Sequence, residues 1–339
     1  MPPTRPTALR ITTDLNSPGR HFGDAMLRWS DNTNPLGYHP IPVVSLNGGT
    51  GPTLLLVGGT HGDEFEGPAA IMRLIQKLDP QDLSGRIIAL PAFHAPALEA
   101  SSRTSPLDGQ NLNRAFPGDA RGGPTAMLAQ FLEADLLPLS DAAVDLHSGG
   151  KASVFTPCAL PTATADQALA ASNMDLARAF GLPTIWRLGA HNDARSVNAA
   201  AERAGVAMIA AELGGGGGCD PSITTAAEAG LYNILHHLGM IAGAPPTPPA
   251  QRVVEIADPL DSLYAPAAGL YDRGLEAGQE VQAGDAAGVF HYITEPERPS
   301  RPITIPQSGL VLAHANRGLV KRGELLALIV RDAAPGPPG

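Results

Sequence analysis

The sequence predicts an α/β fold with a mixed, mostly parallel sheet flanked by helices, followed by a small all-β module. From about residue 50 to 240, short apolar runs alternate with longer segments of helical periodicity, a pattern typical of layered α/β domains. After the Pro-rich segment 243–251, only short runs separated by Gly, Pro and Asp follow, as in small barrels and sandwiches. We therefore expect an α/β domain over 1–243, a β-barrel or sandwich over 252–331, and a disordered tail over 332–339.

The elements follow from the spacing of apolar residues. Residues 1–45 are Pro-rich and polar with little periodicity, which predicts an arm or edge strands. Apolar runs bounded by Gly or Pro predict strands, at 53–57, 85–93, 142–147 and 206–213. Helical spacing predicts helices, at 67–78, 125–139, 164–181 and 224–241. In the module, strands are expected in RVVEI, GLYD, EVQAGDAAGVF, ITIPQSGLVLA and ELLALIV.

The composition limits the partners and the compartment. The net charge of −10 argues against nucleic acid as a partner. No apolar run approaches the roughly 18 residues that span a bilayer, and the start lacks the apolar core of a secretory signal. We therefore expect no membrane partner. The two cysteines, Cys158 and Cys219, give no disulfide framework and fit a reducing cytoplasm. The sequence is also compatible with a homo-oligomer.

Two Gly-rich turns that follow apolar strands carry the main candidate site. The turn GGTHGDEFEG at 58–67 holds His61 and Glu64, and the run VDLHSGG at 144–150 holds His147. Parallel sheets carry their sites at the carboxyl ends of strands, and two His with one carboxylate are a ligand set of catalytic zinc. A single His is usually structural, so the combination carries the prediction. Asp63 and Glu66 are rival carboxylates in the same loop, and Asp145 is placed to orient His147 from its own strand.

A second loop, RTSPLDGQNLNRAFPG at 103–118, offers groups for a carboxylate. It contains Arg103, Asn111, Asn113 and Arg114, and a guanidinium binds a carboxylate with two parallel hydrogen bonds. The alternative is a surface loop whose arginine pairs with a neighbouring acid.

A third element is AAELGGGGGCD at 210–220, in which Glu212 ends an apolar strand. A carboxylate in a partly apolar site has a raised pKa and is suited to act as a general base. The alternative is a flexible loop with an incidental Glu.

Taken together, HGDE, DLHSGG, NLNR and the Glu-bearing strand resemble the succinylglutamate desuccinylase/aspartoacylase family, which is related to the zinc carboxypeptidases. The longer NLNR signature and the ELGGGG run are similar to the branch that deacetylates N-alpha-acetyl-L-2,4-diaminobutyrate in ectoine degradation. The resemblance implies one Zn²⁺ per chain, held by His61, Glu64 and His147. It implies that Glu212 is the general base, and that Arg103 polarises the scissile carbonyl.

The same resemblance implies the groups that hold the substrate and leaves the substrate itself open. Asn113 and Arg114 match the pair that binds the substrate's carboxylate. Asn111, Lys151 and His191 are further candidates near the pocket, and a surface role for Lys151 is the simpler alternative. The expected reaction is hydrolysis of an N-acyl amino acid. Another N-acyl amino acid, a small peptide-like amide, or a non-catalytic metal-binding role remain alternatives, whereas a serine hydrolase is disfavoured because no GxSxG lies near a His/Asp set.

Overall fold

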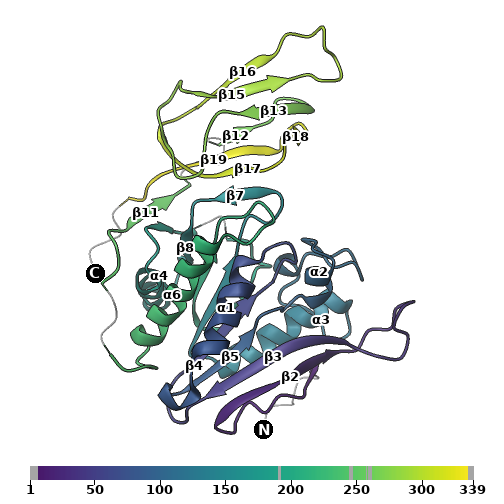
Figure 1. Cartoon of the computed structure of the whole chain (residues 1–339), viewed down its shortest axis with the longest axis vertical. Helices are drawn as coiled ribbons and strands as arrows, with labels where there is room; N and C mark the ends of the chain where they lie inside the picture. The colour runs from purple at the N-terminus through teal and green to yellow at the C-terminus, as the bar shows by residue number, and fades with distance from the viewer. Residues whose placement is uncertain (1–6, 190–191, 244–246, 257, 259–261, 335–339) are drawn as a thin grey trace.

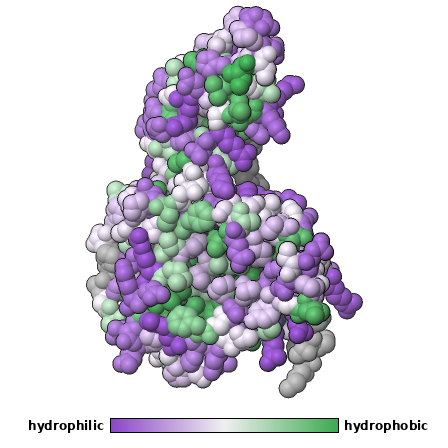
Figure 2. All heavy atoms as spheres, turned by 45° about the vertical axis from the view of Figure 1, so that its right-hand side comes forward, coloured by the Kyte–Doolittle hydropathy of each residue, from purple (hydrophilic) through white to green (hydrophobic). Residues whose placement is uncertain are grey.

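A computed structural model of the chain describes residues 7–189, 192–243, 247–256, 258 and 262–334. Figure 1 shows a large α/β part with the C-terminal strands stacked on one end of it. In the space-filling view these two parts form a broad lobe and a narrower one, and the visible face is largely hydrophilic with scattered apolar patches (Figure 2). Within the described part of the chain, every helix is too short or too polar to cross a membrane.

The large sheet is mixed and runs through both parts. Its main path is β1 (Arg10–Ile11), β2 (Gly19–Leu27), β3 (His39–Asn47), β5 (Arg86–Leu90), β4 (Thr53–Gly58), β6 (Ala142–His147), β10 (Ala207–Glu212), β8 (Cys158–Pro161), β9 (Thr184–Trp186), β11 (Arg252–Glu255), β19 (Leu325–Asp332), β17 (Gly309–Ala315) and β14 (Glu280–Val281). The neighbours β5, β4, β6 and β10 are parallel to one another. Their carboxyl ends therefore lie along one edge.

Different helices cover the two faces of this sheet, and β4 is therefore buried on both sides. Leu54 and Leu56 belong to one hydrophobic core, and Leu55 and Val57 belong to the other, as expected for a parallel strand between two helical layers. The first core is closed by α1 (Glu66–Lys77), α4 (Gln167–Phe180) and α6 (Pro221–His237), and the second by α2 (Ala95–Glu99), α3 (Pro124–Phe131) and α5 (Val197–Ala204).

The C-terminal strands add a smaller antiparallel sheet. Its order is β16 (Arg301–Thr304), β15 (Ala286–His291), β13 (Gly269–Arg273) and β18 (Leu319–Val320). Phe290 of this sheet shares a hydrophobic core with Val311 of β17 and Ile329 of β19, so the two sheets pack face to face. A short strand of the α/β part, β7 (Ser153–Phe155), pairs with β17, and β12 (Leu263–Tyr264) pairs with β19.

The predicted mixed α/β architecture is confirmed, but the large sheet is not mostly parallel. Its parallel pairs lie only among β5, β4, β6 and β10 and among β8, β9 and β11, and its other described pairs are antiparallel. Further corrections are needed at four places. β3 is not an edge strand, because it lies between β2 and β5. The sequence patterns did not indicate β7, β8, β9, β12, β18, α2 or α5. The helix expected at 224–241 begins earlier, at Pro221, where the Asp220 side chain caps it. β19 extends to Asp332, one residue into the expected tail, and Ala333 still bonds to β11; residues 335–339 lie outside the described part.

Candidate metal centre and active site

The candidate site lies where three neighbouring parallel strands end. Gly58 of β4 pairs with Leu146 of β6, and Glu212 of β10 pairs with His147. This register brings the turn after β4, the end of β6 and the end of β10 together, although they are far apart in sequence. At Gly67 a Cβ would come within 2.5 Å of the Leu146 side chain. Glycine there lets the start of α1 approach β6 closely.

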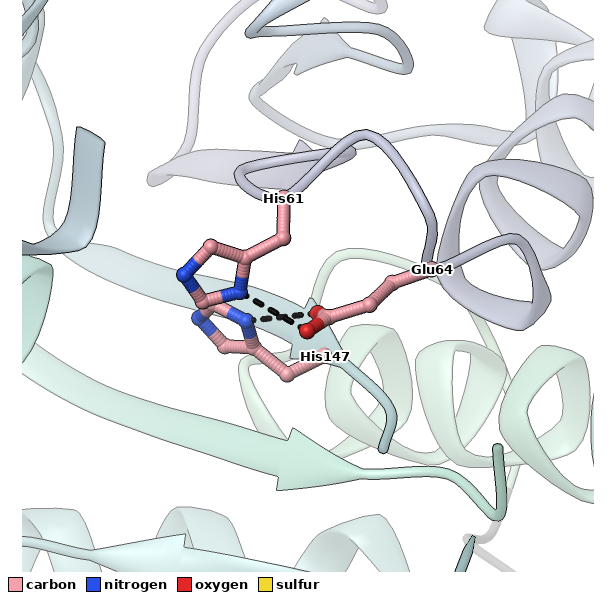
Figure 3. Close-up of side chains that lie close together, drawn as sticks. All are labelled: His61, Glu64 and His147. Carbon is pink, nitrogen blue, oxygen red and sulfur yellow. Dashed lines mark hydrogen bonds and ion pairs between the residues drawn. The ribbon is translucent and has the colours of Figure 1, made fainter. Parts of the chain in front are cut away.

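His61, Glu64 and His147 converge as predicted, and Figure 3 shows both imidazoles facing one carboxylate. His61 Nδ1 lies 2.8 Å from Glu64 Oε1, and His147 Nδ1 lies 2.9 Å from Glu64 Oε2. All three side chains are buried, and one ligand atom from each fits within 4.8 Å of the others. This is the cluster with metal-ligand geometry in the described residues.

The outward nitrogen of each histidine already has an acceptor. His147 Nε2 lies 2.7 Å from Asp145 Oδ2, and His61 Nε2 lies 3.1 Å from Asn111 Oδ1. That amide oxygen also accepts the backbone N–H of Asn113, which fixes it as an acceptor. In neutral histidines these Nε2 atoms therefore carry the protons, and the Nδ1 lone pairs point at carboxylate oxygens. Lone pairs facing lone pairs are satisfied by a cation between them, so the donor set fits a zinc ion.

The buried charges act on one another. Burial lowers the pKa of His61, which favours its neutral, ligating form. Burial also acts to lower the pKa of His147, but the carboxylates of Asp145 and Glu64 raise it well above its ordinary value. Although burial opposes ionisation of Glu64, the two histidines hold its pKa below the ordinary range. The cluster therefore presents an ionised carboxylate between two histidine side chains.

Behind the ligands lies a layer of buried polar groups. The Thr60 hydroxyl donates to Asp145 Oδ1 at 2.9 Å, and both side chains are fully buried. His94, also fully buried, lies with Nδ1 3.3 Å from the Thr60 carbonyl, and burial lowers its pKa to about 4. Thr60 and His94 therefore support the turn from behind. No sequence pattern indicates this role, because neither residue belongs to a recognisable ligand spacing.

The rival carboxylates of the turn are separated from the ligand set. Asp63 Oδ2 accepts the backbone N–H of Lys151 at 2.9 Å, so this side chain ties the turn to the loop after His147. Glu66 is the first residue of α1 and is fully buried, and burial raises its pKa. Neither carboxylate belongs to the cluster with metal-ligand geometry.

Glu212 lies beside this cluster with an unpartnered oxygen. Its Oε2 is buried and has no hydrogen-bond partner among the described residues. Burial first, and then the nearby Glu64 carboxylate, raise the pKa of Glu212 to about 8. The glycines at 214–217 that follow all have positive φ, which only glycine adopts freely. The glycines therefore allow the backbone after Glu212 to adopt a conformation that other residues rarely adopt.

Arg103 and Lys151 come from two loops next to the cluster. The Arg103 Nη1 atom donates to Glu64 Oε1 at 3.1 Å, and nearly half of the side chain is exposed. Lys151 Nζ donates to the carbonyl of Ser101 at 2.6 Å, two residues before Arg103. Lys151 therefore ties the loop after His147 to the loop that carries Arg103.

The NLNR segment places its polar groups between the cluster and a further loop. Asn111 contacts His61, whereas Asn113 Oδ1 accepts the backbone N–H of Val197 at 2.9 Å. Arg114 Nε lies 3.1 Å from Asp193 Oδ2. The alternative interpretation of this loop, in which its arginine pairs with a neighbouring acid, therefore holds for Nε of Arg114. His191 lies outside the described residues.

The fold and these residues define a class of amide-hydrolysing deacylases. The chain belongs to the succinylglutamate desuccinylase/aspartoacylase family, whose catalytic-domain model matches residues 50–238. It is 32% identical over 326 residues to the N-alpha-acetyl-L-2,4-diaminobutyric acid deacetylase of Halomonas elongata, covering 96% of this chain and 95% of that protein. The family predicted from the motifs is thereby confirmed.

Solved structures agree over nearly the whole chain. A succinylglutamate desuccinylase/aspartoacylase from Rhodobacter sphaeroides is 34% identical with a TM-score of 0.91, covering 96% of this chain and 100% of that one. The product-bound ectoine utilisation protein EutE (DoeB) from Ruegeria pomeroyi is 32% identical with a TM-score of 0.92 and the same coverage. Both likenesses include the C-terminal strands as well as the catalytic part.

Proposed function

We propose that this chain is a zinc-dependent deacylase of N-acyl amino acids that converts N-alpha-acetyl-L-2,4-diaminobutyrate into acetate and diaminobutyrate. The observation that carries the proposal is the pair of histidine Nδ1 atoms aimed at the two oxygens of Glu64, beside the unpartnered carboxyl oxygen of Glu212. The relative from Halomonas elongata supports the choice of substrate. We also propose that the fold is related to that of the zinc carboxypeptidases.

The ligand set defines what a bound ion would contribute. His61, Glu64 and His147 would hold zinc, which supplies a Lewis acid and lowers the pKa of water. Asp145 and Asn111 keep the two imidazoles in the tautomer that leaves Nδ1 free. Thr60 in turn holds Asp145.

The residues around this centre have separate tasks in amide hydrolysis. Glu212, with its free oxygen, takes a proton from the attacking water and returns it to the leaving amine, as a carboxyl with a raised pKa is suited to do. Arg103 presents a partly exposed guanidinium beside Glu64, where it stabilises the negative charge that develops on the carbonyl oxygen. Arg114 and the amide nitrogen of Asn113 bind the substrate's carboxylate and so position the amide.

A substrate panel tests this function. The purified chain is analysed for zinc and then assayed with N-acetyl-2,4-diaminobutyrate, N-acetylaspartate, N-succinylglutamate and neutral N-acetyl amino acids. We expect about one zinc per chain and the fastest acetate release from N-acetyl-2,4-diaminobutyrate. Faster hydrolysis of another member would replace the substrate. Stoichiometric zinc with no hydrolysis of any member would instead indicate a non-catalytic metal-binding protein.

A further inference from the structure

The loop before α5 holds the carboxylate-binding arginine through one acidic residue. Arg114 Nε lies 3.1 Å from Asp193 Oδ2, and Arg114 Nη1 donates to the carbonyl of Asn113 at 2.6 Å. Within the described part of the chain, Nη2 of Arg114 has no hydrogen-bond partner. The guanidinium is therefore held at Nε and at Nη1, and its Nη2 donors remain for a ligand.

Asp193 is itself held firmly by Arg195. Its Oδ1 accepts the backbone N–H of Arg195 at 2.9 Å and the Nε–H at 3.0 Å, while Oδ2 accepts from Arg195 Nη2 at 2.9 Å. These hydrogen bonds hold the pKa of Asp193 below the ordinary carboxyl range. Asp193 is thus an ionised anchor whose position is set before any ligand arrives.

The net charge of Arg114, Asp193 and Arg195, called the triad below, explains why Asp193 does not neutralise the carboxylate-binding site. A lone Asp–Arg pair is neutral and attracts a carboxylate weakly. Here Arg114, Asp193 and Arg195 carry two positive charges and one negative charge, so one positive charge remains. The Arg103 guanidinium is close enough to lower the pKa of Arg114, after the larger effect of burial. Arg103, which bonds to Glu64, therefore adds positive charge within electrostatic reach of Arg114.

The same loop also holds the neighbouring amide. Val197 N donates to Asn113 Oδ1 at 2.9 Å, and Phe116 N donates to the Arg195 carbonyl at 3.3 Å. The Ser196 hydroxyl caps α5 by accepting from Ala199 N, which anchors the loop to a helix of the core. Asn113 and Arg114 are therefore oriented by a segment about 80 residues further along the chain.

We propose that Asp193 is the positioning residue that fixes substrate preference, by holding the Arg114 guanidinium so that its Nη2 donors face the substrate's carboxylate. Arg195 retains Asp193 and preserves the net positive charge of the triad. This inference rests on the proposed function, because it assigns the carboxylate of an N-acyl amino acid to Arg114. It predicts that Asp193 acts through Arg114 and not on the chemical step.

The test is a double-mutant cycle of Asp193→Asn and Arg114→Ala, assayed with an N-acetyl amino acid and with its α-carboxamide. Asp193→Asn keeps the shape and an acceptor oxygen but removes the charge. We expect KM for the carboxylate substrate to rise about fivefold with kcat within about twofold, and KM for the carboxamide to stay unchanged. On the Arg114→Ala background the same change should add less than about twofold, because the partner is gone.

A matched control uses an acid–arginine pair in the C-terminal part of the chain. Arg298 Nη1 lies 3.5 Å from Glu295 Oε2, so Glu295→Gln removes the charge of a paired acid outside the loop that carries Asp193. This control should leave both KM values unchanged. A loss of folding in Asp193→Asn would be seen by thermal unfolding, and Arg195→Gln then supplies the second variant, with the same selective rise in KM expected.

Two failures are distinguishable. If the wild-type chain is active, either of two results overturns the positioning role. One is an equal change in KM for the carboxylate and the carboxamide in Asp193→Asn, and the other is additivity of this change with Arg114→Ala. An inactive wild-type chain would overturn the proposed function instead. The cycle would then be measured by calorimetric binding of N-acetyl-2,4-diaminobutyrate to the same variants, where additive losses would again reject the coupling.

Discussion

Replacing Asp145 tests whether the carboxylate behind His147 sets the affinity of the metal centre. His147 Nε2 lies 2.7 Å from Asp145 Oδ2, and Thr60 donates to Oδ1 at 2.9 Å. In Asp145→Asn the amide oxygen can still accept from His147, while the amide nitrogen turns toward Thr60, whose hydroxyl can rotate to accept. The geometry is therefore kept and only the charge is lost. In Asp145→Ala both contacts are lost, and a fully buried hydroxyl is left without its partner.

The expected losses follow from this difference. Removing the hydrogen-bond partner of a ligating histidine costs about 10–100-fold in metal affinity. We expect Asp145→Asn near the lower figure, which is about 1.4 kcal/mol, and Asp145→Ala near the upper one. Zinc affinity is measured by competition with a chromophoric chelator, and Lys77→Ala, a change on the far end of α1, serves as the control. Zinc affinities of both Asp145 variants within about twofold of wild type would refute the assignment of His147 as a ligand oriented by Asp145.

Three further outcomes are expected. Glu212→Gln should keep zinc but lower kcat by about 10²–10⁴-fold, measured by acetate release; retained turnover would remove Glu212 as the base. Arg114→Ala should raise KM for carboxylate substrates by about tenfold or more, and an unchanged KM would exclude it from the substrate site. Folding raises the pKa of Glu212 from 4.5 to about 8, so in protein stripped of metal its contribution to stability is present below about 4.5 and is lost as pH rises through about 8. Thermal unfolding should therefore show Tm falling with pH across this window in wild type and less in Glu212→Gln; identical slopes would contradict the raised pKa.

Most of the central fold could be predicted because each strand there is a continuous apolar run. The strands β4, β6 and β10 are buried on both faces, so their sequences are mostly apolar and stand out from the polar loops around them. The missed strands are short: β7 has three residues, and β8 has four. Such segments are stabilised by their neighbours and not by their own pattern.

The misreading of β3 has a specific cause. Pro40 and Pro42 make this segment read as an arm, because proline cannot donate to a ladder. β2 pairs with β3 along its whole length, whereas β5 pairs only with Val44 to Asn47, and both prolines lie outside that part. The prolines therefore break no ladder with β5, and the rest of the strand is free to sit inside the sheet.

The candidate site likewise has a part that the sequence patterns predict and a part that they do not. His61, Glu64 and His147 were predictable because each lies at the end of a strand or in the turn that follows one. The link between Arg114 and Asp193 was not, because it joins two loops without a shared motif. Pairing between distant loops depends on the tertiary structure, which one sequence does not display.

The pairing of β7 with β17 has a consequence for how the enzyme is made. Ser153–Phe155 follows the His147 turn directly, yet its partner strand spans Gly309–Ala315, and Asn316 also bonds to Lys151 and Ala152. During synthesis the three candidate ligand residues emerge early. β7 can bond to Gly214 and Gly215, but its other side stays unpaired until residue 315 of β17 has been translated. A chain halted before that point would carry the ligands with an open rim.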